Sequence, residues 1–168
     1  MTTPVFNLEK SLQALIYVAN RLQKKDFHKI FKVIYFADRE HIAKCGRFIT
    51  GDTYVRMKYG PVPSAIYNLI KSNEYPALFD INGYTVEPKV DADTIYLSVS
   101  DVRELDDSIK KYGELNMNVL TELSHGYAWI SAAKNGYMSV EDILKEADCE
   151  KEYIDYICEH IALQKSLL

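Results

Sequence analysis

The stretch DFHKIFKVIYFADREHIAKCG, residues 26–46, decides the fold of this chain. Asp26 can cap a helix and Gly46 commonly ends one, so the pattern predicts a helix from Asp26 to about Lys44. The first half of this helix is apolar on almost every side: Phe27, Ile30, Phe31, Val33, Ile34, Tyr35, Phe36 and Ala37. Helices of this kind are buried, so we expect it at the centre of the molecule, with a polar second half over residues 38–41.

Capping residues followed by apolar residues at helical spacing predict further helices around this one. They begin at Asn7 (to about Gln23), Ser98 (to Tyr112-Gly113), Asn116 (through Leu120 and Leu123 and past His125), Ser139 and about Glu150. Ser98 and Asp101 have the spacing of a capping box. In the last helix, one face carries Ile154, Ile157, Cys158 and Ile161.

The middle of the chain has β-strand patterns. Residues 54–59 alternate in polarity, which predicts a short strand, and we expect residues 60–63 to break it. Pro63 suits the first turn of a helix that continues to about Ile70. Residues 73–98 predict two or three small strands, one of them near residues 95–97. The expected fold is mainly α (α+β): a compact helical domain with a small central β-hairpin or short sheet, spanning residues 1–168 as one domain.

Length and composition point to an ordinary globular protein. The chain has 168 residues, 48% apolar and 26% charged. The longest strongly apolar run near the start, residues 14–19, is too short for a membrane span, and the first residues do not resemble a signal peptide. Cys45, Cys149 and Cys158 fit neither a disulfide framework nor a zinc pattern. We therefore expect a cytoplasmic protein that does not bind membranes.

The net charge of −4 is unevenly spread. Residues 1–75 carry 12 basic and 6 acidic side chains, whereas residues 76–168 carry 8 basic and 18 acidic ones. The asymmetry has two explanations: a charged partner, or two halves that face each other in the folded domain. General nucleic-acid binding is disfavoured, because it rests on a clustered basic surface.

Candidate chemistry is sparse. Asp38 and His41 project from one side of the predicted central helix and suit a metal or acid–base site, but no second histidine stands at zinc spacing. The alternative is a polar pair that satisfies its own hydrogen bonds. His125 and Trp129 are a helical step apart, a common packing pair. Cys45 lies between Lys44 and Arg47, yet a passive role is favoured. Gly51 and Gly60 form no phosphate loop, so we expect no catalytic residue, metal or cofactor.

Tyrosine is abundant, with 13 residues against 6 phenylalanines and 1 tryptophan. Tyrosine is enriched at protein interfaces, and it also suits the rim of a small core with its hydroxyl in water. Both interpretations are compatible with each other.

Three ordered segments, KVIYFADREH (32–41), GRFITGDTY (46–54) and MKYGPVPS (57–64), together with LSH (123–125) and AW (128–129), resemble the Panacea domain of the SocA-like antitoxin family. The resemblance covers about residues 8–135, and the helices of residues 139–168 are extra. The motif residues are Tyr35, Asp38, Arg39, His41, Arg47, Gly51, Asp52, Tyr54, Met57, Tyr59, Gly60, Pro61, Pro63, His125 and Trp129. Cys45 and Phe48 depart from the family pattern, which bears on partner specificity more than on fold.

The resemblance implies a mostly helical cytoplasmic protein of bacteria, phages or mobile elements. It would be the antitoxin of a toxin–antitoxin pair, neutralising a cognate toxin by protein contact and not by catalysis. We expect the motif residues to form a scaffold or to bind the toxin, and favour the scaffold. Exposed residues of the β element or the C-terminal helices would then choose the partner. Other partners and functions stay open: a second copy of the chain, a transcription-linked or phage-related regulatory role, or a metal-dependent hydrolase built on Asp38, His41 and His125.

Overall fold

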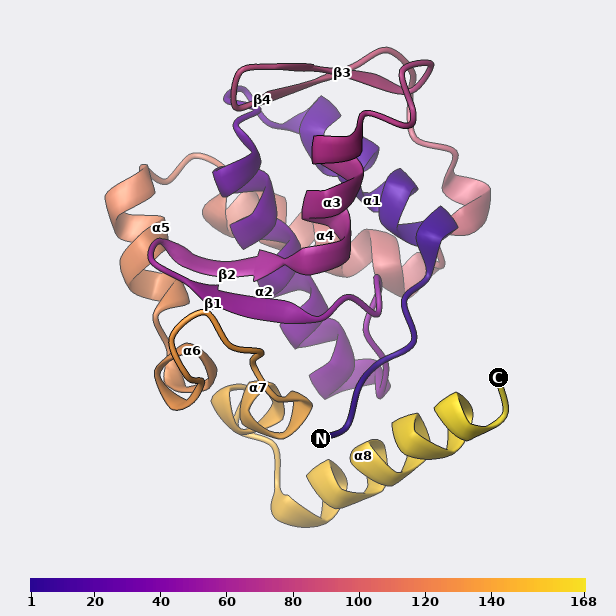
Figure 1. Cartoon of the computed structure of the whole chain (residues 1–168), viewed down its shortest axis with the longest axis vertical. Helices are drawn as coiled ribbons and strands as arrows, with labels where there is room; N and C mark the ends of the chain where they lie inside the picture. Colours follow the sequence, from indigo (N-terminus) through magenta and orange to yellow (C-terminus); the bar gives the residue numbers. More distant parts are fainter.

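A computed structural model describes all residues, 1–168 (Figure 1). The elements in chain order are α1 (Leu8–Arg21), α2 (Phe27–Cys45), β1 (Tyr54–Met57), β2 (Gly60–Pro63), α3 (Ser64–Ser72), β3 (Phe79–Asn82), β4 (Thr85–Pro88), the 3-10 helix η1 (Thr94–Tyr96), α4 (Val99–Tyr112), α5 (Met117–Ser124), α6 (Tyr127–Ser131), α7 (Val140–Glu146) and α8 (Lys151–Ser166). The fold is mainly α with two small antiparallel hairpins, as the sequence predicts.

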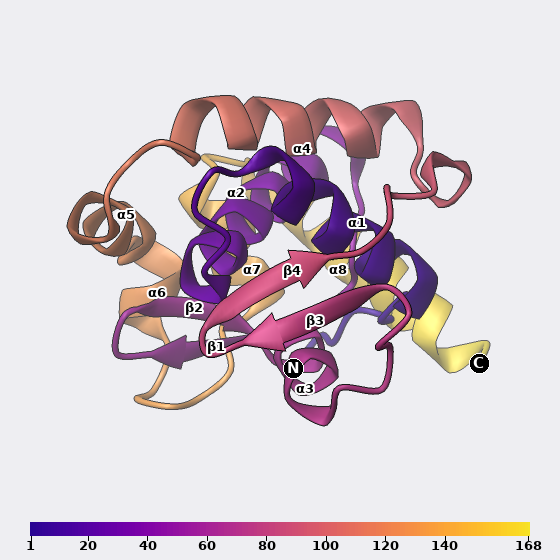
Figure 2. The ribbon, with the colours of Figure 1, turned by 90° about the horizontal axis from the view of Figure 1, so that it is seen from above.

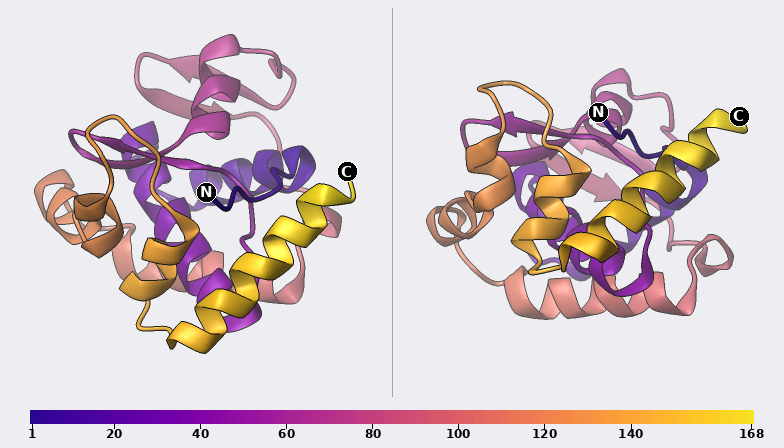
Figure 3. Two further views of the ribbon diagram at one scale, coloured as in Figure 1. Left: turned by 60° about the horizontal axis from the view of Figure 1, so that its bottom comes forward. Right: turned by 90° about the horizontal axis from the view of Figure 1, so that it is seen from below.

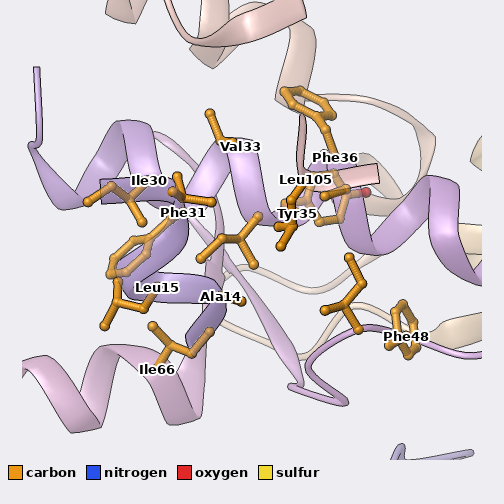
Figure 4. Packing of buried hydrophobic residues seen from close by; sticks show 14 of the residues in the cluster. Ala14, Leu15, Ile30, Phe31, Val33, Tyr35, Phe36, Phe48, Ile66 and Leu105 are labelled. Carbon is orange, nitrogen blue, oxygen red and sulfur yellow. The ribbon is translucent and has the colours of Figure 1, made fainter. Parts of the chain in front are cut away.

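Helix α2 is the centre of the molecule. Every residue from Lys29 to Asp38 is buried, and side chains of α1, α3 and α4 pack around it (Figure 4). The Asp26 side chain accepts a hydrogen bond from the Lys29 N–H at 3.0 Å, and Gly46 ends the helix with φ 77°. The predicted central helix is therefore confirmed, including both of its ends.

The other helices surround α2. Helix α4 lies across one side of α2, with α1 next to both (Figure 2). Helices α5, α6 and α7 follow along another side, and α8 extends past the N-terminal segment (Figure 3). The predicted capping box of Ser98 and Asp101 is present, and Asn7, Asn116 and Ser139 each cap a helix. None of the helices combines the length and the apolar character that a bilayer span requires.

The prediction that residues 60–63 break the strand is wrong, because they form β2, the second strand of a hairpin. Pro61 lies opposite Arg56, whose N–H donates instead to the Gly136 carbonyl oxygen on the other side of β1, at 2.8 Å. Proline is tolerated at such a position because no N–H is needed there. Pro63 directly precedes α3 instead of lying in its first turn.

Two further predictions are wrong. Residues 95–97 form no strand: the Asp93 side chain accepts a hydrogen bond from the Ile95 N–H at 3.1 Å, and the chain makes one turn of 3-10 helix. The helix that begins after Asn116 ends at Ser124, and α6 begins at Tyr127, where the Ala128 N–H donates to the Glu146 carboxylate. A Cβ at Gly126 would lie 2.2 Å from Glu146 Oε1.

The two oppositely charged halves of the chain face each other. Lys10 and Arg47 both pair with Asp101, Lys44 pairs with Glu104, and Arg39 reaches Glu146. Each of these pairs joins the basic first half to the acidic second half. These four ion pairs support the explanation that the two halves face each other in the folded domain.

Candidate functional site

Asp38 lies at the centre of a fully buried hydrogen-bond network. Its carboxylate accepts hydrogen bonds from the Ile49 and Thr50 N–H groups (2.7 and 3.1 Å), the Thr50 hydroxyl (2.5 Å) and the Tyr54 hydroxyl (2.6 Å). Burial raises the pKa of Asp38 to about 6, although these hydrogen bonds oppose the rise. The carboxylate is therefore ionised at neutral pH and ties the loop after α2 to the helix.

The Asp52 carboxylate ties the same loop to the N-terminus of α3. Its oxygens accept hydrogen bonds from the Ala65 and Ile66 N–H groups, both at 2.9 Å, at the N-terminus of that helix. Burial raises the pKa of Asp52, against the effect of these hydrogen bonds. Gly51, just before it, has φ 68° and forms the predicted turn. The Gly51-Asp52 motif therefore links the loop to α3.

Tyr35 and Arg39 converge on Glu146, a residue of α7. The Tyr35 hydroxyl donates to Glu146 Oε2 at 2.6 Å, and Arg39 Nη1 donates to the same oxygen at 3.1 Å. The other carboxylate oxygen accepts from the Ala128 N–H at the start of α6, at 3.1 Å. One carboxylate thus joins α2, α6 and α7.

His41 belongs to a separate network, at the N-terminus of α4. Its Nδ1 lies 2.7 Å from the Arg47 carbonyl oxygen, and its Nε2 lies 2.9 Å from the Ser100 hydroxyl and 3.2 Å from Asp101 Oδ1. Burial would raise the pKa of Asp101, but hydrogen bonds from Lys10 and Ser98 and the charge of Arg47 lower it. Burial lowers the pKa of His41.

Asp38 and His41 thus take part in different networks, which fits the sequence alternative of self-satisfied polar groups. No group of three or more His, Cys, Asp or Glu side chains is arranged to hold a metal ion. The three cysteines are free. In this arrangement the buried polar side chains of the motif connect loops and helix ends through hydrogen bonds.

Met57, Tyr59, Gly60 and Pro61 of the motif lie at the tip of the β1–β2 hairpin. The turn passes closely over α2 and α5: a Cβ at Gly60 would lie 2.3 Å from Ser124 Oγ and 2.5 Å from Lys32 Cε. Gly60 also has φ 116°, which other residues rarely adopt. The hairpin tip is therefore fixed in place on the helices.

His125 and Trp129 lie at the junction of α5 and α6, and Trp129 contacts the hairpin tip. Their rings stack with centroids 3.7 Å apart, and the Trp129 indole N–H donates to the Met57 carbonyl oxygen at 2.9 Å. Arg56 lies over the Trp129 ring at 4.0 Å. The spacing of His125 and Trp129 predicts that both lie on one helix. In the structure His125 follows the end of α5 and Trp129 lies in α6.

The hairpin tip lies beside α5 and α6 (Figure 1). These helices, the tip and the loop that leads to α7 carry exposed apolar side chains. We call this surface the tip face. Its residues are Met57, Tyr59, Val119, Leu123, Tyr127, Ile130 and Tyr137. Tyr137 is joined to the hairpin by a bridge to Val55. Tyr35 and Tyr54 are buried and their hydroxyls donate to Glu146 and Asp38, so they do not lie at a core rim with the hydroxyl in water, whereas Tyr59, Tyr127 and Tyr137 are exposed.

Sequence reasoning missed Glu146, the ion pairs of Asp101 beyond its capping box, and the burial of Lys32. Glu146 and Asp101 are far along the chain from their partners on α2, and only the fold brings them together. Lys32 lies in an apolar run of the sequence and has no exposed surface, although it is a lysine. A charged residue inside such a run was the one available signal for an unusual environment.

The family model described as "Antitoxin SocA-like, Panacea domain" matches residues 30–130, more than half of the chain. The match runs from the first turn of α2 to the end of α6 and contains every motif residue. No curated protein and no solved structure matches the chain. Over residues 30–130, which contain the Asp38 and Asp52 networks and the hairpin tip, this chain belongs to the SocA-like antitoxin family with the Panacea domain.

Proposed function

We propose that this protein is the antitoxin of a toxin–antitoxin pair and neutralises its toxin by direct binding through the tip face. Family membership carries the antitoxin role. The position of the binding surface follows from exposure. A cluster of exposed aromatic and aliphatic side chains on a rigid support is typical of protein interaction sites. No catalytic step is part of the proposal.

In this proposal the buried motif residues stabilise the fold and the exposed ones bind the toxin. The buried residues, such as Asp38 and Asp52, keep the loop and α3 in place. The hairpin tip, which Gly60 brings onto α2 and α5, presents Met57 and Tyr59 to the partner. Residues of α5 and α6, outside the hairpin, complete the face and select which toxin binds.

The basic first half of the chain does not favour the regulatory alternative. Four of the twelve basic side chains of residues 1–75, Lys10, Arg39, Lys44 and Arg47, are engaged in ion pairs with acidic residues of the second half. Specific DNA binding needs basic side chains free to contact phosphates. We therefore place the toxin, and not DNA, as the partner in this proposal.

A growth assay tests the antitoxin role. Each flanking gene is expressed alone and then together with this protein; one neighbour should arrest growth alone and lose its toxicity in the pair. If neither neighbour arrests growth, the proposal fails for this protein.

Two variants then test the binding surface. Tyr127→Asp places a charge on the tip face, whereas Tyr156→Asp makes the same change at an exposed position of α8, outside it. We expect Tyr127→Asp to lose rescue and co-purification of the toxin, with an unchanged circular dichroism spectrum, and Tyr156→Asp to retain both. The opposite pattern would move the binding surface to α8.

A further inference from the structure

A cavity of about 370 Å³ lies between α2, the β1–β2 hairpin and α3. Aromatic side chains form much of its wall: Phe27, Phe31, Tyr59, Tyr67 and Tyr84. Phe31 and Tyr67 meet edge to face, with ring centroids 5.9 Å apart. The volume is within the range of small-molecule sites, which are mostly apolar with a few polar groups that fix the ligand's orientation.

The cavity wall contains a buried lysine and a largely buried histidine, and both have few hydrogen-bond partners. Lys32 lines it with no exposed surface, and its ammonium makes one long hydrogen bond, 3.4 Å to the Pro61 carbonyl oxygen. The Nδ1 atom of His28 is buried in the same wall without any hydrogen-bond partner.

No acidic residue lines the cavity, so nothing in the wall neutralises this charge. Burying an ammonium group without an anionic partner is costly, so a bound anion would be strongly stabilised there. Burial lowers the pKa of Lys32 to about 8, which leaves the ammonium largely charged at neutral pH.

The walls also limit the rest of the ligand. Ser64 and Asn68 are the neutral polar side chains apart from tyrosine, too few to pair the N–H and C=O groups of a peptide segment. An aromatic or branched aliphatic body would instead pack against the rings, with one charged end at Lys32.

We propose that this cavity is a binding site for a small monocarboxylate with an apolar body, whose carboxylate pairs with the Lys32 ammonium while its body lies among Phe27, Phe31 and Tyr67. The cavity shares Met57 and Tyr59 with the tip face, but binding of a carboxylate there does not require a toxin. Asp26 is the acidic residue whose charge acts on Lys32, but it does not line the cavity and forms no ion pair with the ammonium, so a bound carboxylate would supply the direct counter-charge.

Three probes of the same shape test the proposal on the intact protein: 3-phenylpropionate, its neutral amide 3-phenylpropionamide, and the cation 3-phenylpropylamine. Titration calorimetry and amide chemical shifts measure affinity and location. We expect the acid to bind at least roughly tenfold more tightly than the amide, the amine to bind weakest, and the shifts to centre on the cavity wall. Equal affinity of acid and amide, or no binding of any probe at about 10 mM, overturns the proposal.

A matched pair of variants tests whether the Lys32 ammonium is the charge that binds the carboxylate. Lys32→Met removes the buried ammonium at similar length, and Lys58→Met removes an exposed lysine of the same wall. The acid-over-amide preference should fall to about onefold in Lys32→Met and remain near wild type in Lys58→Met, because exposed charges are screened by solvent. Circular dichroism checks that both variants fold. A preference that survives in folded Lys32→Met refutes the assignment to this residue.

Discussion

Asp38 shows how a single carboxylate can organise a loop. It is completely buried, and its four hydrogen-bond donors come from Ile49, Thr50 and Tyr54, in the loop after α2 and in β1. Removing the carboxylate would leave these donors buried without an acceptor. Each unsatisfied donor costs about 1–3 kcal/mol, so the loop depends on this residue.

We therefore predict that Asp38→Ala lowers the free energy of unfolding by about 3 kcal/mol or more, measured by urea denaturation. Asp80→Ala is the control, because Asp80 is exposed and its ion pair with Lys89 contributes little. If Asp38→Ala instead keeps wild-type stability but no longer neutralises the toxin, Asp38 belongs to the binding surface and its scaffold role is wrong.

Lys32 predicts a pH dependence of stability. Burial lowers its pKa in the folded state to about 8 from 10.5, so between these values the unfolded state holds more protons. The free energy of unfolding therefore gains a contribution from Lys32 as pH rises through this window. Lys32→Met should be more stable than wild type at pH 7, by up to about 3 kcal/mol, with the difference shrinking toward pH 10.5. Urea unfolding of both proteins across this range measures it; a difference independent of pH contradicts the prediction.

At the scale of elements, the β1–β2 hairpin connects the buried scaffold to the exposed tip face. Its first strand contains Tyr54, which donates to Asp38, and its turn rests on Lys32 and Ser124. The loop at residues 135–138 pairs with the other side of β1. The hairpin is thus held from both sides, which suits a surface that must keep its shape.

The two hairpin turns offer a matched test of this close packing. Gly60 and Gly83 both have positive φ, but a Cβ at Gly83 meets nothing within 4 Å. Gly83→Ala should cost about 1 kcal/mol from backbone strain alone. Gly60→Ala should cost at least about 2 kcal/mol more, because its Cβ overlaps Ser124 and Lys32. Thermal denaturation compares them, and equal losses would mean that the hairpin tip is not tightly packed.

At the scale of the whole molecule, the C-terminal helices share the core of the family segment. Ile154, Ile157 and Ile161 of α8 join the same hydrophobic cluster as α2, and the Tyr153 hydroxyl donates to the Ile42 carbonyl oxygen at 3.2 Å. Glu146 of α7 adds the link to Tyr35 and Arg39 described above. These contacts favour one cooperative unit over two independent ones.

We predict that the whole chain unfolds in one transition. Trp129 is the single tryptophan and reports on the hairpin tip through its fluorescence, whereas circular dichroism reports on all helices. Both signals should give the same denaturation midpoint. A separate earlier transition in circular dichroism would indicate that α7 and α8 unfold on their own and that residues 1–168 are not a single domain.

The sequence by itself determined the central helix, most helix ends and the family. Apolar residues on every side and local caps are properties of neighbouring residues, so they can be read directly from the chain. It failed where contacts between distant segments decide the structure. The strand at residues 60–63 pairs with β1, whose other side bonds to the loop at 135–138, and the Glu146 carboxylate lies against the break at Gly126.

Only the tertiary structure decided what each motif residue does. The sequence placed Asp38 and His41 on one side of a helix, but their partners lie in separate loops and helices. It also showed Lys32 as one lysine among others, whereas the fold buries it in a cavity without an acidic residue. The physical reason is common to both: hydrogen bonds and ion pairs act over a few ångströms in space, and distance along the chain does not fix distance in the fold.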